Sequence, residues 1–164
     1  MKDIKIRNVL PDDVATCHGI ETACFEPSEA ATEDKIRKRQ QLFPEGFLVA
    51  EMNRKVVGFI NSGATDKPDL SDEAFKDLIG HDSAGRHMVI LSLAVHPVYQ
   101  GAGMSRVLLE AFIERSTSMG KKTILLLCKE NLLAYYAKFG FENLGVSASD
   151  HGGFRWHEMR VMVG

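Results

Sequence analysis

Two short segments of the chain carry residue types that could do chemistry, and the first of them is a turn with two glycines. A predicted helix follows this turn, which reads Gln100-Gly101-Ala102-Gly103-Met104-Ser105-Arg106. Backbone amides at the start of a helix have no partner within the helix, and glycine lets such amides approach an oxygen atom closely. Because the helix dipole also favours negative charge at this end, the turn is suited to binding a diphosphate group.

The spacing of the turn excludes two common phosphate-binding loops. The nucleotide-binding P-loop needs Lys followed by Ser or Thr after its second glycine, whereas Met104 and Ser105 stand there. The dinucleotide-binding loop needs a third glycine where Arg106 stands, and the chain that follows is too short for the remaining units of that fold. A tight strand-to-helix turn without a ligand remains the alternative for the glycines alone.

The turn requires a strand before it and a helix after it, and the hydrophobic pattern predicts both. Residues 88–95 form a nearly continuous apolar run, which is typical of a strand buried on both faces. Pro97 ends this strand because proline cannot donate a hydrogen bond to a sheet. Beyond the glycines, apolar residues at helical spacing predict a helix to about Met119, with Gly120 as its C-terminal stop.

The remaining pattern predicts a single α/β domain, of the α+β kind, over residues 1–164. The predicted order is strand, helix, helix, a two-strand hairpin, an insertion, strand, helix, strand, helix and two closing strands. The corresponding segments are residues 4–9, 11–25, 32–42, 47–52 with 56–62, 65–87, 88–95, 104–119, 123–128, 131–139, 141–146 and 154–163. Residues 53–55 connect the hairpin. The polar insertion is a candidate lid, with a short helix whose apolar residues are Phe75, Leu78 and Ile79.

Composition and charge limit the kinds of partner. Of the 164 residues, 45% are hydrophobic and 26% charged, and the net charge is −2, whereas proteins held by a nucleic-acid backbone usually carry a basic excess. No apolar run reaches the length that spans a bilayer, and the charged start of the chain lacks the apolar block of a signal peptide. Cys17, Cys24 and Cys128 have no metal-site spacing and are predicted to be reduced, buried thiols. We therefore expect a cytoplasmic protein with no metal, nucleic-acid or membrane partner.

The second chemical segment lies nearer the end of the chain and reads Tyr135-Tyr136-Ala137-Lys138-Phe139-Gly140-Phe141. It resembles the Tyr-x-x-x-Gly-Phe signature of the GNAT superfamily of N-acyltransferases, and the glycine turn resembles the Gln/Arg-x-x-Gly-x-Gly/Ala loop of that superfamily. Ser105 departs from the Gly or Ala of the last loop position but is also small. The arylalkylamine, or serotonin-type, N-acetyltransferases are most similar, because they share the strand end Leu93-Ala94-Val95-His96 and a Cys before the tyrosine pair.

The resemblance implies the GNAT fold, which is a mixed, mostly antiparallel central sheet flanked by helices, and acetyl-CoA as the co-substrate. In relatives the pantetheine arm pairs with the strand end that here contains Leu93, Ala94 and Val95. The diphosphate binds the loop, which here comprises Gln100, Gly101, Ala102, Gly103, Met104, Ser105 and Arg106. Tyr136 matches the tyrosine that protonates the departing thiolate, with a packing role as the alternative.

The resemblance supplies no general base. Val89 and Leu91 stand where the serotonin-type enzymes carry two histidines, and many other relatives carry a glutamate at the position of Leu91. Neither apolar side chain can accept a proton. The alternatives are a path through water and backbone carbonyls, a carboxylate such as Glu21 or Glu26, or an amine substrate with a low pKa.

The predicted function is acetyl-CoA-dependent transfer of an acetyl group to a small primary amine, arylalkylamine-like or polyamine-like, by direct attack on the thioester. Holding two substrates in attack geometry can supply much of the acceleration without a covalent enzyme intermediate. Two alternatives stay open: a peptide or protein N-acetyltransferase, and a non-catalytic acyl-CoA-binding regulatory domain. The protein is expected to be a monomer or a homodimer.

Overall fold

The structure is a computed structural model that describes residues 3–164. Its strands are β1 (Ile4–Asn8), β2 (Leu48–Met52), β3 (Lys55–Thr65), β4 (His87–Val95), β5 (Thr123–Cys128), β6 (Glu142–Val146) and β7 (His157–Met162). Its α-helices are α1 (Val14–Cys24), α2 (Glu33–Leu42), α3 (Met104–Ser118) and α4 (Leu133–Ala137). The predicted order of strands and helices is confirmed.

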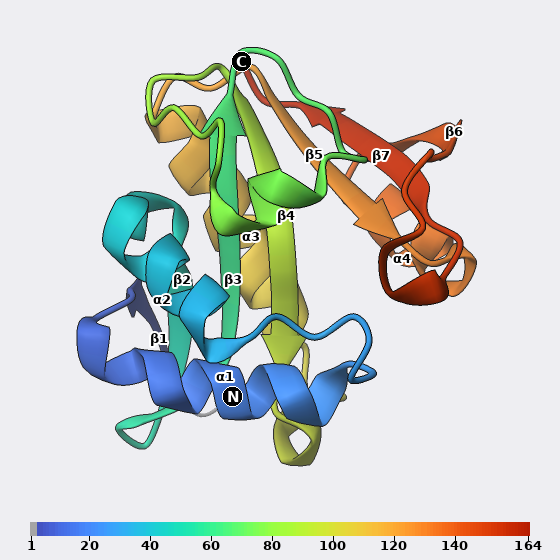
Figure 1. Ribbon diagram of the computed structural model, residues 1–164. Coiled ribbons are helices and arrows are strands. Elements are labelled where there is room, and N and C mark those ends of the chain that lie inside the picture. The colour runs from blue at the N-terminus through green and yellow to red at the C-terminus, as the bar shows by residue number, and fades with distance from the viewer. Residues whose placement is uncertain (1–2) are drawn as a thin grey trace.

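All seven strands form one sheet in the order β1-β2-β3-β4-β5-β7-β6. Every neighbouring pair is antiparallel except β4 and β5, which are parallel. The predicted mixed, mostly antiparallel sheet is therefore confirmed. The parallel pairing covers only His87–Val89 against Thr123–Leu125. Beyond these residues the two strands diverge, as Figure 1 shows.

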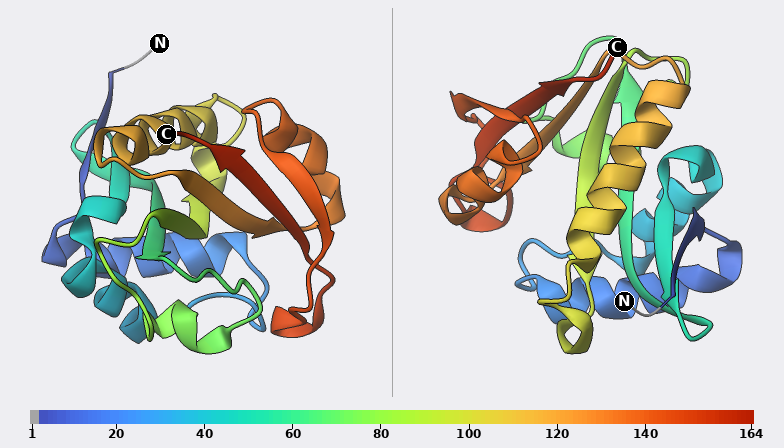
Figure 2. Two further views of the ribbon diagram at one scale, coloured as in Figure 1. Left: turned by 90° about the horizontal axis from the view of Figure 1, so that it is seen from above. Right: turned by 180° about the vertical axis from the view of Figure 1, so that it is seen from behind.

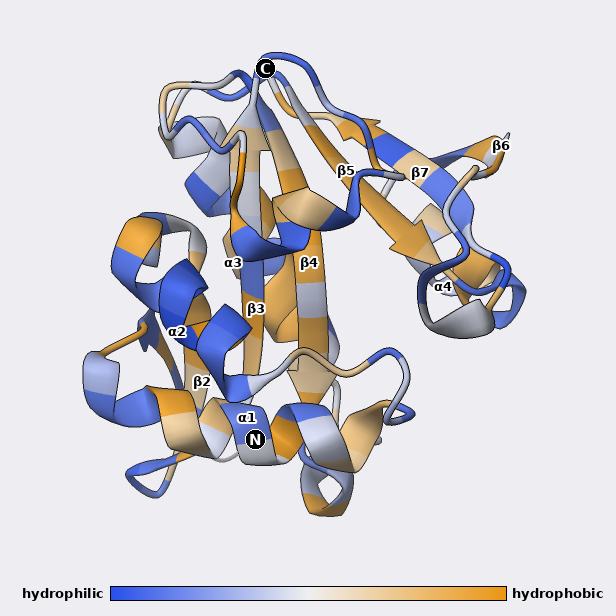
Figure 3. Cartoon of the chain, in the orientation of Figure 1, coloured by the Kyte–Doolittle hydropathy of each residue, from blue (hydrophilic) through white to orange (hydrophobic). Residues whose placement is uncertain are grey.

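Helices cover both faces of the sheet. Figure 2 shows α3 along one face, whereas α1 and α2 lie on the other. The inner side of α3 is fully buried at Leu108, Leu109 and Phe112. On the opposite face, Cys17 of α1 and Ile36 of α2 are equally buried. In Figure 3 the apolar colour concentrates on the central strands, which accounts for the apolar runs in the sequence.

Local signals in the sequence explain where the first two helices begin. Pro11 opens a 3₁₀ turn, Pro11–Asp13, that leads directly into α1. Thr32 caps α2, because its hydroxyl accepts a hydrogen bond of 3.3 Å from the Lys35 amide. Both starts agree with the predicted ones.

The hairpin differs from its prediction. Asn53 and Arg54 alone connect β2 to β3, with φ of 53° and 64°. A two-residue connection with two left-handed residues matches the twist of antiparallel strands. The second strand therefore begins at Lys55, one residue earlier than predicted, and it continues to Thr65.

The insertion between β3 and β4 contains a 3₁₀ helix, Glu73–Asp77, where a short helix was predicted. Phe75 and Leu78 are buried, as predicted, but Ile79 is 64% exposed. The prediction for Ile79 was wrong because Leu78 adopts a left-handed φ of 59°, which ends the helix and turns the next side chain outward.

Two elements near the C-terminus differ in their bounds from the prediction. The predicted helix over 131–139 begins as a 3₁₀ turn, Glu130–Leu132, and α4 ends at Ala137. The strand predicted from residue 154 begins at His157, because Gly152 and Gly153, both with positive φ, form a turn before it. Within residues 3–164, no helix combines the length and apolar character needed to cross a membrane.

Candidate active site

Within residues 3–164, no strand pairs with one side of the end of β4. In the ladder with β3, Asn61 pairs with Ser92 but the next pair is Ser62 with Ile90, so the strand bulges at Leu91. The amide of His96 donates to the Val57 carbonyl of β3 at 2.8 Å. Because residues of an antiparallel strand alternate between partners, the backbone groups of Leu93 and Val95 face the side where β5 has diverged.

One of these groups is already bonded. The Val95 carbonyl accepts a hydrogen bond of 2.9 Å from Gln100 Nε2 and one of 3.1 Å from Cys24 Sγ. The side chain of Gln100, a predicted coenzyme residue, thus ties the glycine turn to the strand end and to α1. The amide and carbonyl of Leu93 and the amide of Val95 therefore remain available to a ligand.

The glycine turn leaves the start of α3 open. Gly101 and Gly103 have φ of 86° and 80°, and a Cβ added at either position would meet nothing within 4 Å. Gly103 is the N-cap of α3 and provides no side chain to cap the first amides. The uncapped start of α3 consequently lies beside open space, as an anion site at a helix start requires.

The side chains of the turn have different surroundings. Met104 is 1% exposed, backbone included, and belongs to the core, so Ser105 and Arg106 are the residues of the helix start that reach the surface. Arg106 extends into solvent, with its guanidinium 3.4 Å from the carboxylate of Glu110. The Ser105 hydroxyl lies 2.6 Å from the hydroxyl of Tyr135. That hydrogen bond joins the start of α3 to α4.

Tyr136 lies in a dry, aromatic environment. It is 9% exposed and contacts Tyr135 and Phe141 edge to face, with ring centroids 5.4 Å and 5.8 Å away. Burial raises the pKa of its phenol, and the neighbouring Cys128 and Tyr135 add to this effect. The phenol makes no hydrogen bond to another residue of 3–164, so its proton is free to be donated to a ligand.

A cavity of about 310 Å³ lies where β4 and β5 diverge, and it is lined by residues from both strands, α1, α2, α4 and the insertion. Tyr136, Glu21 and Phe25 all line it. Two further phenylalanines, Phe43 and Phe47, could be thought candidates for its wall, but both are fully buried in the core. Those two side chains pack between elements of the sheet and its helices, away from the cavity.

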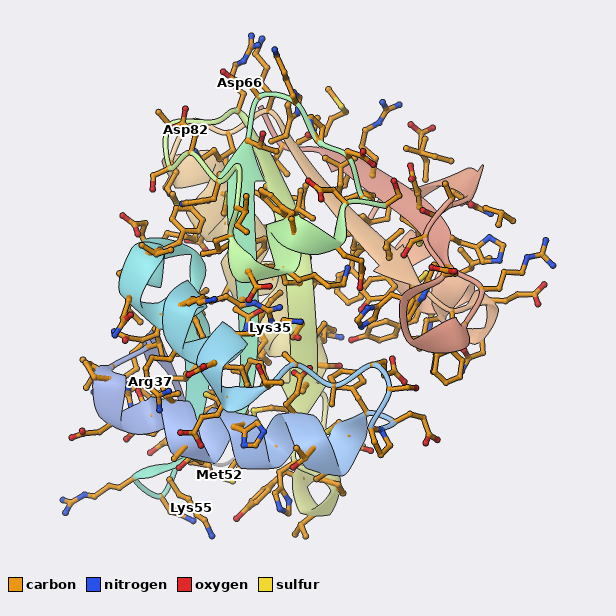
Figure 4. The ribbon with its side chains drawn as sticks, in the orientation of Figure 1. Lys35, Arg37, Met52, Lys55, Asp66 and Asp82 are labelled. Atoms are coloured by element: carbon orange, nitrogen blue, oxygen red, sulfur yellow. The ribbon has the colours of Figure 1, made fainter. Side chains whose placement is uncertain are left out.

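The insertion and α2 close one side of this cavity. Asp69, Leu70 and Phe75 of the insertion line it. Figure 4 shows Lys35, another lining residue, between α2 and β4, whereas Asp66 lies at the distant end of the insertion. Residues 65–87 thus contribute one wall, and their role as a lid stays a prediction.

Polar side chains are buried at the edge of the cavity. Glu21 and Arg39 are each 2% exposed and both line it. Arg39 donates to the Lys76 carbonyl at 3.1 Å and to Asn61 Oδ1 at 3.3 Å. Arg39 was not among the predicted site residues. Its only signal is a spacing of three residues from the apolar Ile36 in an otherwise polar helix, which does not distinguish a buried arginine from a solvated one.

The candidate positions for a general base differ in whether they line the cavity. Val89 and Leu91, the two positions that the sequence resemblance associates with proton transfer, line the cavity with apolar side chains. Glu26 is exposed and is not among the lining residues. His96 accepts a hydrogen bond of 3.2 Å from the Val98 amide and caps the turn after β4, which agrees with its expected place at the strand end.

A sheet that splits between β4 and β5, an uncapped helix start and a buried tyrosine beside the split define a class of acyl-coenzyme A transferases. Residues 14–141 match the family model described as the acetyltransferase (GNAT) family. The chain belongs to this family, as the resemblance in its sequence predicted, and it is an acetyltransferase.

Individual relatives agree with this assignment. The chain is 28% identical over 163 residues to a serotonin N-acetyltransferase of Mesocricetus auratus, which covers 97% of this chain and 77% of the relative. The loading GNATL domain of CurA from Lyngbya majuscula superposes with a TM-score of 0.86 at 17% identity, covering 99% of this chain and 98% of that one. The putative acetyltransferase yncA from Salmonella typhimurium, solved with acetyl-CoA, has a TM-score of 0.69 at 22% identity, over 99% and 95% of the two chains.

Proposed function

We propose that the protein transfers the acetyl group of acetyl-CoA to a small primary amine by direct attack of the amine on the thioester. The observation that carries this proposal is the cavity between β4 and β5, which is lined by Tyr136 and adjoins the unpaired strand end. The thioester of the coenzyme and the attacking amine would meet in this cavity.

The coenzyme would be held mainly by backbone groups. The uncapped amides at the start of α3 suit the diphosphate, and Gly101 and Gly103 place no Cβ in the open space beside them. The pantetheine arm would lie along β4 like an added strand, using the groups of Leu93 and the Val95 amide that face away from β3. This arrangement needs no excess of basic side chains, in agreement with the net charge of −2.

Tyr136 would complete the reaction by protonating the departing thiolate. Its raised pKa keeps the phenol protonated at neutral pH, so the donor is present in every molecule. A phenol next to a thiolate of lower basicity can donate only if the two are within hydrogen-bond reach. The position of Tyr136 on the cavity wall supports such a contact.

Contacts between segments that border the cavity favour a small acceptor over a peptide. His151 Nδ1 lies 2.7 Å from Glu73 of the insertion, and His151 Nε2 lies 2.9 Å from the Glu29 carbonyl. Lys129 Nζ donates to Glu29 at 2.8 Å and stacks on the ring of Phe154, 3.7 Å from its centroid. A peptide substrate needs an open groove, whereas these bridges tie the insertion, the segment between α1 and α2 and the turn before β7 to one another beside the cavity.

The name of the Mesocricetus relative favours an arylalkylamine as the acceptor. A polyamine is the second acceptor class, because Asp69 and Asp72 on the insertion line the cavity and carry the charge that a second ammonium group requires. The cytoplasmic location and the monomeric or homodimeric state stay predictions.

Thiol release measured with a panel of amines tests the proposal. Purified protein with acetyl-CoA is expected to release free thiol with 2-phenylethylamine or spermidine, and mass spectrometry is expected to find the N-acetylated amine. Release with a peptide that has a free N-terminus, and with neither amine, would replace the proposed acceptor class by the peptide alternative. Coenzyme binding without thiol release on any acceptor would favour the non-catalytic alternative.

A further inference from the structure

We infer that Glu21 is the catalytic base that accepts the proton of the acceptor amine. The inference rests on the proposed function and adds the group that this function lacks, because Val89 and Leu91 cannot take a proton. It assigns the acceptor to the class of cationic primary amines, which arrive with a proton that must be removed before attack.

The contacts of Glu21 leave one of its two carboxylate oxygens free. Oε2 accepts hydrogen bonds from the Ala31 amide at 2.8 Å and from the Ser92 hydroxyl at 3.3 Å. Oε1 is buried and has no hydrogen-bond partner within residues 3–164. A buried carboxylate oxygen without a donor is costly, so most are satisfied in native proteins. An ammonium group of a bound amine would provide the missing donor.

The two held contacts also fix the carboxylate in place. The Ala31 amide belongs to the segment between α1 and α2, and Ser92 belongs to β4 directly after the bulge at Leu91. Glu21 is therefore anchored to the strand along which the thioester would lie. Ser92 is one residue from Leu93, whose backbone we assign to the coenzyme, so the base and the acetyl group would approach the amine from adjacent places.

The surroundings of Glu21 raise its pKa above that of an ordinary carboxyl group and so bring it closer to the pKa of an amine. Burial raises its pKa, the guanidinium of Arg39 lowers it, and the carboxylate of Glu29 raises it again. The thiols of Cys17 and Cys24 lie on the same helix and are affected by its charge. A base whose pKa approaches the working pH removes a proton from an ammonium group more readily than an ordinary carboxylate does.

Other carboxylates at the cavity already have partners. Glu29 pairs with Lys129, and Asp69 and Asp72 accept hydrogen bonds from the amides and hydroxyl of nearby residues of the insertion. Glu26 is exposed and lies outside the lining. Of the carboxylates that line the cavity within residues 3–164, Glu21 is the one that combines burial with an unbonded oxygen.

The proton and electron balance of the reaction is complete with these groups. The ammonium transfers one proton to Glu21, and the neutral nitrogen attacks the thioester carbon, forming a C–N bond as the C–S bond breaks. The departing thiolate takes a proton from Tyr136. The nitrogen loses its second proton to solvent, the phenolate regains one from solvent, and Glu21 releases its own. The net products are the amide, free coenzyme A and one proton.

A matched pair of substrates tests this role. O-Benzylhydroxylamine has an oxygen in place of one methylene of 2-phenylethylamine and carries no proton at neutral pH, so it needs no base for its first deprotonation. In Glu21→Gln we expect kcat/KM for 2-phenylethylamine to fall by about 100-fold or more, and the value for O-benzylhydroxylamine to fall by less than about tenfold. Raising the pH is expected to restore part of the lost rate with 2-phenylethylamine only.

Two controls separate catalysis from folding. Glu26→Gln changes a nearby carboxylate outside the cavity and is expected to retain wild-type rates with both substrates. Glu21→Gln is expected to fold with a melting temperature no lower than wild type at neutral pH and to bind acetyl-CoA with near wild-type affinity, since Gln can still accept from the Ala31 amide. Glu21→Asp is expected to recover part of the rate on the protonated amine.

The outcomes distinguish this inference from the proposed function. Equal losses on both substrates in Glu21→Gln, or full activity with both, would overturn the role of Glu21 while the wild-type rate still supports amine acetylation. A loss in Glu26→Gln on 2-phenylethylamine alone would move the base to Glu26. If the wild-type protein acetylates no amine at all, the proposed function fails first, and the inference fails with it.

Discussion

The Tyr136 hydroxyl is the proton donor that can be removed with the least disturbance to the fold. Tyr136→Phe retains the edge-to-face contacts with Tyr135 and Phe141, and it removes a hydroxyl that has no hydrogen-bond partner within residues 3–164. We expect kcat to fall by about 100-fold or more, with the Kd for acetyl-CoA nearly unchanged. Stopped-flow thiol release and calorimetry measure the two quantities.

Tyr135→Phe is the neighbouring control for that experiment. Its hydroxyl bonds to Ser105 and is not at the cavity, so its removal is expected to reduce kcat by less than about tenfold. An unchanged kcat in Tyr136→Phe would show that Tyr136 only packs and that the thiolate receives its proton elsewhere.

Glu21 also has a predicted effect on stability, and the sign follows from its raised pKa. The folded protein binds the Glu21 proton more tightly than the unfolded chain does, so stability falls as the pH rises from the unfolded pKa, about 4.3, to the higher folded pKa. Glu21→Gln has no carboxylic acid to titrate at this position, so its stability does not fall over this pH range. Thermal unfolding is expected to show the variant more stable than wild type at neutral pH, with a difference that shrinks toward pH 4.

A less stable Glu21→Gln at neutral pH, equal to wild type in acid, would mean that the carboxylate is a stabilising ion with a lowered pKa. That result would contradict the cost that we assign to burying its unpaired oxygen.

At the scale of residues, Tyr136 could be predicted from the sequence because it lies within a recognisable motif. Arg39 and Ser92 could not, since their importance comes from burial next to Glu21 and not from their types.

At the scale of elements, the start of α3 depends on two left-handed glycines. Gly103→Val places a branched side chain at a φ of 80° and is expected to cost about 1–2 kcal/mol of stability and to abolish binding of acetyl-CoA. Gly103→Asn tolerates the backbone better, so it separates the steric block from misfolding. Chemical denaturation and calorimetry check both effects, and normal coenzyme binding in both folded variants would mean that the turn binds no diphosphate.

The contact between α3 and α4 is a second feature at the scale of elements. Ser105 and Tyr135 share a hydrogen bond of 2.6 Å. A double-mutant cycle with Ser105→Ala and Tyr135→Phe is expected to give a coupling of about 0.5–1.5 kcal/mol in unfolding free energy. Additive effects would show that the two helices are held together by packing alone.

Some elements could be predicted because their residues specify them locally. Thr32 caps α2, Pro97 ends β4 and the apolar run of β4 indicates a buried strand. The bulge at Leu91 and the two-residue hairpin turn could not be predicted from residue types, since each depends on how a strand pairs with its neighbour.

At the scale of the whole molecule, the site exists because the sheet splits. The three residue pairs between β4 and β5 hold the two halves together at one end, and β7 rather than β6 pairs with β5 at the other side. The strand order places β7 out of chain sequence, and no local pattern signals it. The mixed α/β class and the element order could be predicted from the sequence, whereas the cavity follows from tertiary pairing.

Titration of acetyl-CoA into the purified protein by isothermal calorimetry tests the central claim most directly, namely that the amides at the start of α3 and the free edge of β4 bind this coenzyme. We expect saturable heat with one site per chain, and no such heat with Gly103→Asn although that variant remains folded. Absence of heat from the folded wild-type protein, or identical binding by Gly103→Asn, would contradict the account.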